Sequence, residues 1–253
     1  MAAIQQQLGM SFLAPTTITA SEEATGHPAT NVGVFTKFRR TARSTTTTDP
    51  WIVVCDFGAT TTIAGIFLNN SNFQFALVAT SPNGTTWTEV GTFSNLIDDR
   101  VQPRRKIWIP NSGWTASRYY RIRATTLLAG ETYFELGTMA FPSPISGMTR
   151  NFAPPRWTPR EPITWLDYAG GGNEINVEGP DLMSYDLQFG PSVPAAMTQQ
   201  MQLRGVGQGL PFFYFENRGD MTKAYILKRR GEVTVQEQVG VLQVAPWTLI
   251  EAS

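Results

Sequence analysis

The spacing of apolar residues constrains the fold more than any other feature of the sequence. Short runs, in which apolar and polar residues alternate, are separated by turn-forming glycine, proline and asparagine. Such alternation is typical of half-buried β-strands. The longest helix-like stretch, Ala195 to Leu203, is short. We therefore predict an all-β protein with strands at residues 51–57, 62–68, 74–80, 106–109, 118–125, 133–140, 175–177, 184–189, 210–215, 223–228, 232–235 and 247–251.

The charge content points away from a polyanionic partner. The 253 residues include 20 Lys+Arg and 20 Asp+Glu, so no net field attracts nucleic acid or an anionic membrane. Charged residues make up 16%, below the roughly 25% of ordinary soluble domains. A surface so poor in charge suggests burial against other molecules, and we predict assembly.

Residues for the common catalytic sites are scarce. The chain has one cysteine, Cys55, and one histidine, His27, which leaves zinc sites and the Ser-His-Asp relay without ligands. Carboxylate pairs such as Glu22-Glu23 have no recognisable catalytic context, although they keep a glycan-degrading enzyme as an alternative. We predict no catalytic residue, no metal ligand and no cofactor. No apolar run is long enough to span a membrane, and Met1 to Met10 lacks the pattern of a basic stretch followed by an apolar one. We therefore expect neither membrane insertion nor classical secretion.

Proline divides the chain. Six prolines fall between residues 142 and 162, and proline removes backbone donors and disfavours helix. We predict an N-terminal arm at residues 1–19, a first β domain at 20–142, an extended linker at 143–162 and a smaller β module at 163–253.

Residues 20 to 142 resemble the discoidin or coagulation-factor C-type domain, a galactose-binding-like jelly roll. The resemblance is carried by Trp51–Gly58, Ile63–Leu68, Ser81–Trp87, Arg118–Arg123 and Glu135–Gly137, together with Ala29, Asn31 and Arg43 upstream. Phe57 and Asn83 replace the usual Leu and Asp, and the flanking disulfide of animal members is absent. The resemblance implies a sandwich whose loops bind sugars, lipids or proteins, in some members with calcium.

Three residues are the candidates for weak sugar binding at one end of that sandwich: Arg105, Trp108 and Trp114. A basic run beside an aromatic strand can contact a sugar or phosphate, but we favour a solvated loop paired with Asp98 and Asp99, or an interface patch. Trp108 alternates with Ile107 and Ile109, so it should point to the face opposite theirs. Asp56 is interpreted as a hydrogen-bonding turn carboxylate.

The second half resembles the closing part of tail-tip proteins of long-tailed bacteriophages. The resemblance rests on the apolar strand 210–215, a polar turn, strand 224–227 and a last strand ending in Glu251. It implies a small β-barrel or sandwich that docks into a ring. The residues expected at the assembly interface are Phe212, Phe213, Tyr214, Phe215 and Trp247.

The resulting hypothesis is a structural virion protein, a distal tail or minor tail protein. Its expected partners are copies of itself in a ring, the tube, hub and fibre proteins of the tail, and a host surface glycan, with the virion tail as its location. A non-catalytic carbohydrate-binding module or adhesin is the first alternative, and the glycan-degrading enzyme is the second.

Overall fold

The computed structural model describes residues 7–33, 41–94, 105–147, 156–159, 165–169, 173–177, 183–187, 211–215, 224–230, 235–238, 241–244 and 247–251. Within these ranges every regular element is a strand except one 3-10 turn, η1 (Ala29–Gly33). The predicted all-β fold is confirmed. Two compact units make up the chain: unit 1 contains residues 1–147, 212–225 and 253, and unit 2 contains residues 148–211 and 226–252.

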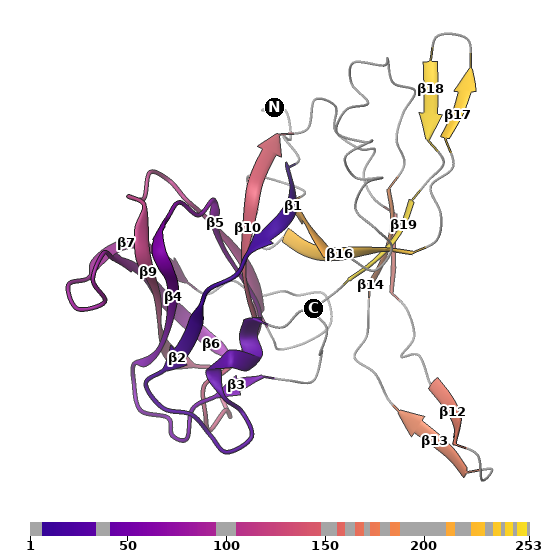
Figure 1. Cartoon of the computed structure of the whole chain (residues 1–253). Coiled ribbons are helices and arrows are strands. Elements are labelled where there is room, and N and C mark those ends of the chain that lie inside the picture. The colour runs from indigo at the N-terminus through magenta and orange to yellow at the C-terminus, as the bar shows by residue number, and fades with distance from the viewer. Residues whose placement is uncertain are drawn as a thin grey trace. The chain divides into compact units, whose positions relative to one another are not determined.

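Unit 1 contains two sheets (Figure 1). The five-stranded sheet runs in the order β2 (Thr17–Ala20), β4 (Trp51–Thr61), β9 (Ser117–Leu127), β6 (Phe73–Ser81), β7 (Thr88–Ser94). The other sheet runs in the order β15 (Pro211–Phe215), β1 (Gln7–Leu13), β10 (Glu135–Gly147), β5 (Gly65–Ser71), β8 (Arg105–Pro110), with β3 (Ala42–Arg43) also on β10. All the pairings within these sheets are antiparallel.

One apolar core lies between the two sheets. Alternate residues of β4, namely Trp51, Val53 and Cys55, are each 1% exposed and belong to this core. Met139 of β10 belongs to it as well, and the Cys55 Sγ lies 3.9 Å from the Met139 Sδ. Because period-two alternation places every second side chain on one face, the two sheets form a sandwich.

The hairpin at Asn83 and Gly84 forms as its sequence predicts. Gly84 has φ +76°, a conformation that a side chain would strain. The Ser81 Oγ accepts the Gly84 N–H at 2.9 Å, and the Asn83 Oδ1 accepts the N–H groups of Thr85 and Thr86 at 3.0 Å. These bonds close the turn that joins β6 to β7.

The first part of the expected linker is a strand. Residues 143–147 form the end of β10, where Ser143 pairs with Ser11 and Gly147 pairs with Gln7 of the expected N-terminal arm. Pro142 and Pro144 are two residues apart, so the N–H groups they lack would have pointed to the same side of the strand. Since β5 pairs with β10 only as far as Ala140, a proline-containing strand is compatible with pairing to β1 on one side.

The chain also returns to unit 1 after residue 211. β15 pairs with β1 through Gln7 and Phe215, Leu8 and Tyr214, and Gly9 and Phe213. The first unit therefore differs from the contiguous domain at 20–142 that the sequence suggested, because β1, the end of β10 and β15 also belong to its sheet.

The described strands of unit 2 form a sheet and two ribbons. In the sheet, β11 (Arg156–Pro159) pairs with β14 (Met183–Leu187), β14 with β19 (Trp247–Glu251), and β19 with the Leu227–Arg230 part of β16 (Ala224–Arg230). The ribbons are β12 (Trp165–Ala169) with β13 (Asn173–Val177), and β17 (Val235–Gln238) with β18 (Val241–Val244).

Candidate functional site

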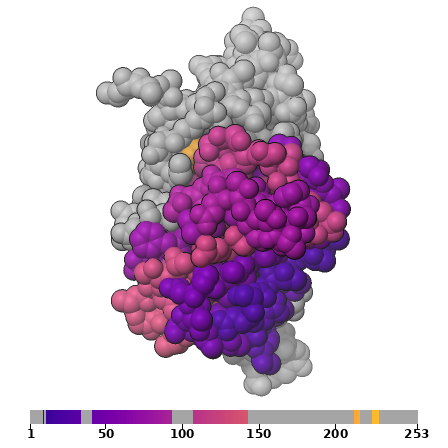
Figure 2. Space-filling model, turned by 90° about the vertical axis from the view of Figure 1, so that its left-hand side faces the viewer, coloured from indigo at the N-terminus to yellow at the C-terminus, as the bar shows by residue number. Residues whose placement is uncertain are grey.

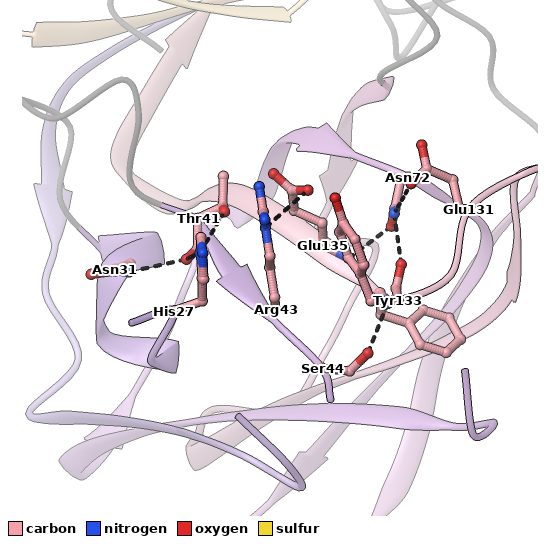
Figure 3. Close-up of polar contacts among 10 residues, drawn as sticks. His27, Asn31, Thr41, Arg43, Ser44, Asn72, Glu131, Tyr133 and Glu135 are labelled. Carbon is pink, nitrogen blue, oxygen red and sulfur yellow. Dashed lines mark hydrogen bonds and ion pairs between the residues drawn. The ribbon is translucent and has the colours of Figure 1, made fainter. Parts of the chain in front are cut away.

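A set of polar side chains meets at η1, β3 and the start of β10 (Figure 3). We call it the end cluster. It consists of the side chains of His27, Asn31, Thr41, Arg43, Ser44, Asn72, Glu131, Tyr133 and Glu135, together with the backbone of Phe134.

An ion pair with a buried carboxylate lies at its centre. Glu135 is 2% exposed and is the register partner of Arg43, whose Nε lies 3.3 Å from the Glu135 Oε2. The Arg43 guanidinium also lies over the Tyr133 ring, 4.8 Å from its centroid. A carboxylate buried this deeply requires a nearby cation, so the pair holds β3 against β10.

Asn72 ties the loop after β9 to the same place. Its Nδ2 donates to the Glu131 Oε2 at 3.1 Å and to the Tyr133 carbonyl at 2.8 Å, while its Oδ1 accepts the Glu135 N–H at 2.7 Å. Asn72 is 0% exposed, and three hydrogen bonds satisfy most of its amide.

The residue after β3 and the residue before β10 are joined in a similar way. Ser44 and Phe134 exchange two bonds, from the Ser44 N–H to the Phe134 carbonyl at 2.9 Å and from the Phe134 N–H to the Ser44 Oγ at 2.8 Å. Phe134 also stacks on Trp51 with ring centroids 6.2 Å apart. The polar cluster is therefore anchored directly on the apolar core.

His27 belongs to the cluster. Its Nδ1 lies 3.2 Å from both the carbonyl and the Oγ1 of Thr41, and the Asn31 Nδ2 donates to the same carbonyl at 3.0 Å. The His27 side chain is half-buried. The sequence signals for this region were the resemblance matches at Ala29, Asn31, Arg43 and Glu135.

The cluster offers both donors and acceptors to solvent. His27, Arg43, Glu131 and Tyr133 are only partly buried, so an imidazole, a guanidinium, a carboxylate and a phenol are accessible together. This combination suits hydrogen bonding to a hydroxyl-rich or polar ligand.

The predicted sugar-binding tryptophans are not at the surface. Trp108 is 1% exposed and packs against Phe213, with ring centroids 4.6 Å apart, and Trp114 is 8% exposed. The backbone of Arg105 begins β8, but its side chain lies outside the described residues, as do Asp98 and Asp99. The structure therefore does not bring these three candidates together as an open aromatic platform.

Four of the five predicted assembly residues are buried within the single chain. Phe212, Phe213, Tyr214 and Phe215 are at most 2% exposed, and Phe213 packs against Trp108 and Phe67 within unit 1. Since the single chain already buries them, their role in contacts between copies stays a prediction. Trp247 begins β19, and its side chain lies outside the described residues.

Asp56 acts as a structural carboxylate. Its oxygens accept two hydrogen bonds from Arg118 and one from the Gly58 N–H at 2.7 Å. The bond from Arg118 is the largest cause that lowers the pKa of Asp56 to about 2. Among residues with described side chains, no three His, Cys, Asp or Glu groups gather as metal ligands. None of the described helical segments is long and apolar enough to span a membrane.

Comparison with known proteins gives likenesses of fold only. No protein-family model and no curated protein sequence matches the chain. Among solved structures, chitosan-binding module 1 of a chitosanase/glucanase from Paenibacillus sp. IK-5 is 19% identical, with TM-score 0.43, over 54% of this chain and 99% of that one. The CBM32 of AlyQ is 16% identical, with TM-score 0.43, over 53% and 99%. CBM32-1 of a family 31 glycoside hydrolase from Clostridium perfringens is 15% identical, with TM-score 0.40, over 52% and 97%.

Proposed function

We propose that this protein is a non-catalytic structural protein that assembles with further copies of itself through unit 2. The observation that carries the proposal is the pairing of the two ribbons. Within the described part of unit 2, β12 pairs only with β13, and β17 pairs only with β18 (Figure 1).

Two-stranded ribbons are incomplete as structures. A lone two-stranded hairpin is marginally stable in water, and stability normally requires a third strand or a packed face. The outer edge of each strand also presents backbone N–H and C=O groups that can pair with another chain. Addition of strands from neighbouring copies would satisfy both requirements, and a repeated head-to-tail contact forms a ring when its rotation closes.

The finer proposal is a place in the tail tip of a bacteriophage, as a distal tail or minor tail protein. Its support is the resemblance of residues 210–251 to the closing part of such proteins, together with the low charge content. In that setting the ring of copies would connect the tail tube to the hub or fibres, and the protein would be located in the virion.

The test measures the mass of the purified chain in solution by light scattering and the shape of its particles by negative-stain imaging. We expect closed rings of the 28.0 kDa protomer. Replacement of residues 235–244 by a short Gly-Ser linker should shift the mass to that of the protomer, since it removes one ribbon. The matched control is the same kind of linker at Thr85-Thr86, in the exposed turn of unit 1. A stable monomer at micromolar concentration, with no incorporation into tail particles, would contradict the proposal.

Carbohydrate recognition by unit 1 is the second candidate, and the end cluster favours it. The partly buried side chains of His27, Arg43, Glu131 and Tyr133 give a sugar both donors and acceptors. We expect affinity in the millimolar range, equivalent to roughly 4 kcal/mol. Titration of neutral and acidic monosaccharides, followed by NMR, should shift signals of His27 and Tyr133. Tyr133→Phe should weaken this response, while Tyr119→Phe, outside the cluster, should not.

A further inference from the structure

The outer face of the five-stranded sheet carries several apolar side chains. Ile52 and Val54 of β4 alternate with the buried Trp51, Val53 and Cys55, so they point away from the core. Leu77 and Phe75 of β6 do the same, since Ala76 and Val78 are in the core. Phe75 is 37% exposed, and among the described residues it is the only large apolar side chain that is exposed.

Two arginines stand in the middle of this apolar face. Arg121 and Arg123 flank the buried Ile122 on β9, the central strand. In the strand register Arg121 lies between Val54 and Ala79, and Arg123 lies between Ile52 and Leu77. We call the set Ile52, Val54, Phe75, Leu77, Arg121 and Arg123 the outer face. Figure 2 views unit 1 from the side on which β7, β9 and β4 lie in Figure 1.

Arg121 lacks the carboxylate partner that the other three arginines with described side chains have. Arg43 pairs with Glu135, Arg118 with Asp56, and Arg123 with Glu89 at 3.1 Å. Of the four arginines whose side chains the structure describes, Arg121 alone has no carboxylate within ion-pair distance. Its guanidinium lies 4.2 Å over the Trp87 ring, and its buried Nε has no hydrogen-bond acceptor among the described residues.

The electrostatics of Arg121 agree with this geometry. Burial lowers the pKa of Arg121, and the nearby Arg123 cation lowers it further, with only partial compensation from Glu89. A carboxylate brought to this position would therefore interact with a cation that is partly desolvated and already oriented by an aromatic ring.

We infer that the outer face is a contact surface for a second copy of this chain, which places a carboxylate over Arg121 and covers Phe75 and Leu77. This inference rests on the proposed assembly function and names a surface for it in unit 1.

The size and shape of the face fit a protein rather than a small molecule. Five strands about 4.8 Å apart, with a residue rise of about 3.3 Å along the nine residues of β6, span roughly 700 Å². Stable interfaces bury about 800 Å² on each partner, so one copy could cover the whole face. Small ligands instead prefer concave sites, and a sheet face is open.

The contact should follow the usual distribution of energy within an interface. A central arginine beside an aromatic residue, with Val54 and Ala79 on either side, is the kind of arrangement in which a few residues carry most of the binding energy. We therefore expect large effects at Arg121 and Phe75 and small effects at polar residues outside the face.

The test measures the association of the full chain by sedimentation velocity over a range of concentrations. Arg121→Gln, which removes the charge, and Phe75→Ser, which removes exposed apolar area, should each raise the dissociation constant at least ten-fold. The matched control is Ser112→Gln, an exposed residue in the loop between β8 and β9, which should leave it unchanged. Thermal melts followed by circular dichroism establish that each variant is folded. If Arg121→Gln does not fold, the dissociation constant of Phe75→Ser alone decides the test.

A second measurement locates the contact directly. A photo-reactive benzoylphenylalanine at position 75 should give a covalent dimer of the full chain on irradiation, and the same group at position 112 should not. Suppose that the unmodified chain assembles, that Arg121→Gln and Phe75→Ser assemble as tightly as it does, and that the photo-reactive group at position 75 gives no dimer. The outer-face inference is then wrong, while the assembly function stands. If the unmodified chain stays monomeric, the assembly function itself fails and the inference fails with it.

Discussion

Arg118 donates two parallel hydrogen bonds to Asp56, from its Nε to the Oδ1 at 2.7 Å and from its Nη2 to the Oδ2 at 2.8 Å. The two residues lie on β9 and β4, beside the irregularity between Asp56 and Thr61 where the register of these strands shifts. A bidentate pair of this kind fixes geometry as well as charge. It secures the two strands at the point where their ladder is interrupted.

The first prediction concerns acid stability. The pKa of Asp56 falls from 3.8 to about 2 on folding, so the folded state favours the charged carboxylate. The stabilising contribution is therefore complete above the unfolded pKa and is lost as the pH falls from about 4 towards 2. Asp56→Asn should reduce stability at pH 7 and flatten its pH dependence in that window, as measured by denaturant unfolding at several pH values. Arg118→Gln should do the same; an unchanged pH slope in both variants would contradict the assignment.

The second prediction concerns the ion pair of the end cluster. Arg43→Ala removes the Arg43 cation from the carboxylate of Glu135, which is 2% exposed, and we expect a loss of about 2 kcal/mol. Partial exposure of Arg43 keeps the value below that of a fully buried pair. The double variant Arg43→Met with Glu135→Leu should be more stable than Arg43→Ala, because no buried charge remains. Equal losses from the single and double changes, in denaturant melts, would argue against a coupled pair.

The third prediction tests the return of the chain to unit 1. Phe213→Ala removes a ring that packs on Trp108 and Phe67, and a buried Phe→Ala change costs about 3 to 5 kcal/mol. Phe75→Ala, at an exposed position on β6, is the matched control and should cost much less. Tryptophan fluorescence should follow the unfolding. A Phe213→Ala variant as stable as the control would mean that β15 contributes little to unit 1.

The fourth prediction compares two glycines with positive φ. Gly65 has φ +153°, and a Cβ there would meet the Ile109 carbonyl and come within 2.7 Å of the Trp108 ring. Gly113 has φ +107°, with open space around the same position. Gly113→Ala should therefore cost only the backbone strain, about 1 to 2 kcal/mol. Gly65→Ala should cost clearly more in thermal melts, because β5 and β8 must also separate; equal costs would exclude crowding.

The sequence by itself determined the class of the fold and the position of many strands. The alternating stretch 51–57 lies within β4 (Trp51–Thr61), and 247–251 coincides with β19. The turn at Asn83 and Gly84 was equally readable. These features depend on contacts between residues close in the chain, so a local pattern of two-residue alternation and turn-forming residues was sufficient.

Only the tertiary structure decided which strands pair and what each face covers. Ile107 and Ile109 join the core between the sheets, and Trp108 lies outside it, as alternation predicts. Its burial depends on Phe213, which lies more than one hundred residues later in the sequence. The ion pair of Arg43 with Glu135 likewise joins residues far apart in the chain. Alternation separates the two faces of a strand but carries no information about the partner of either face, because strand register and packing arise from long-range contacts.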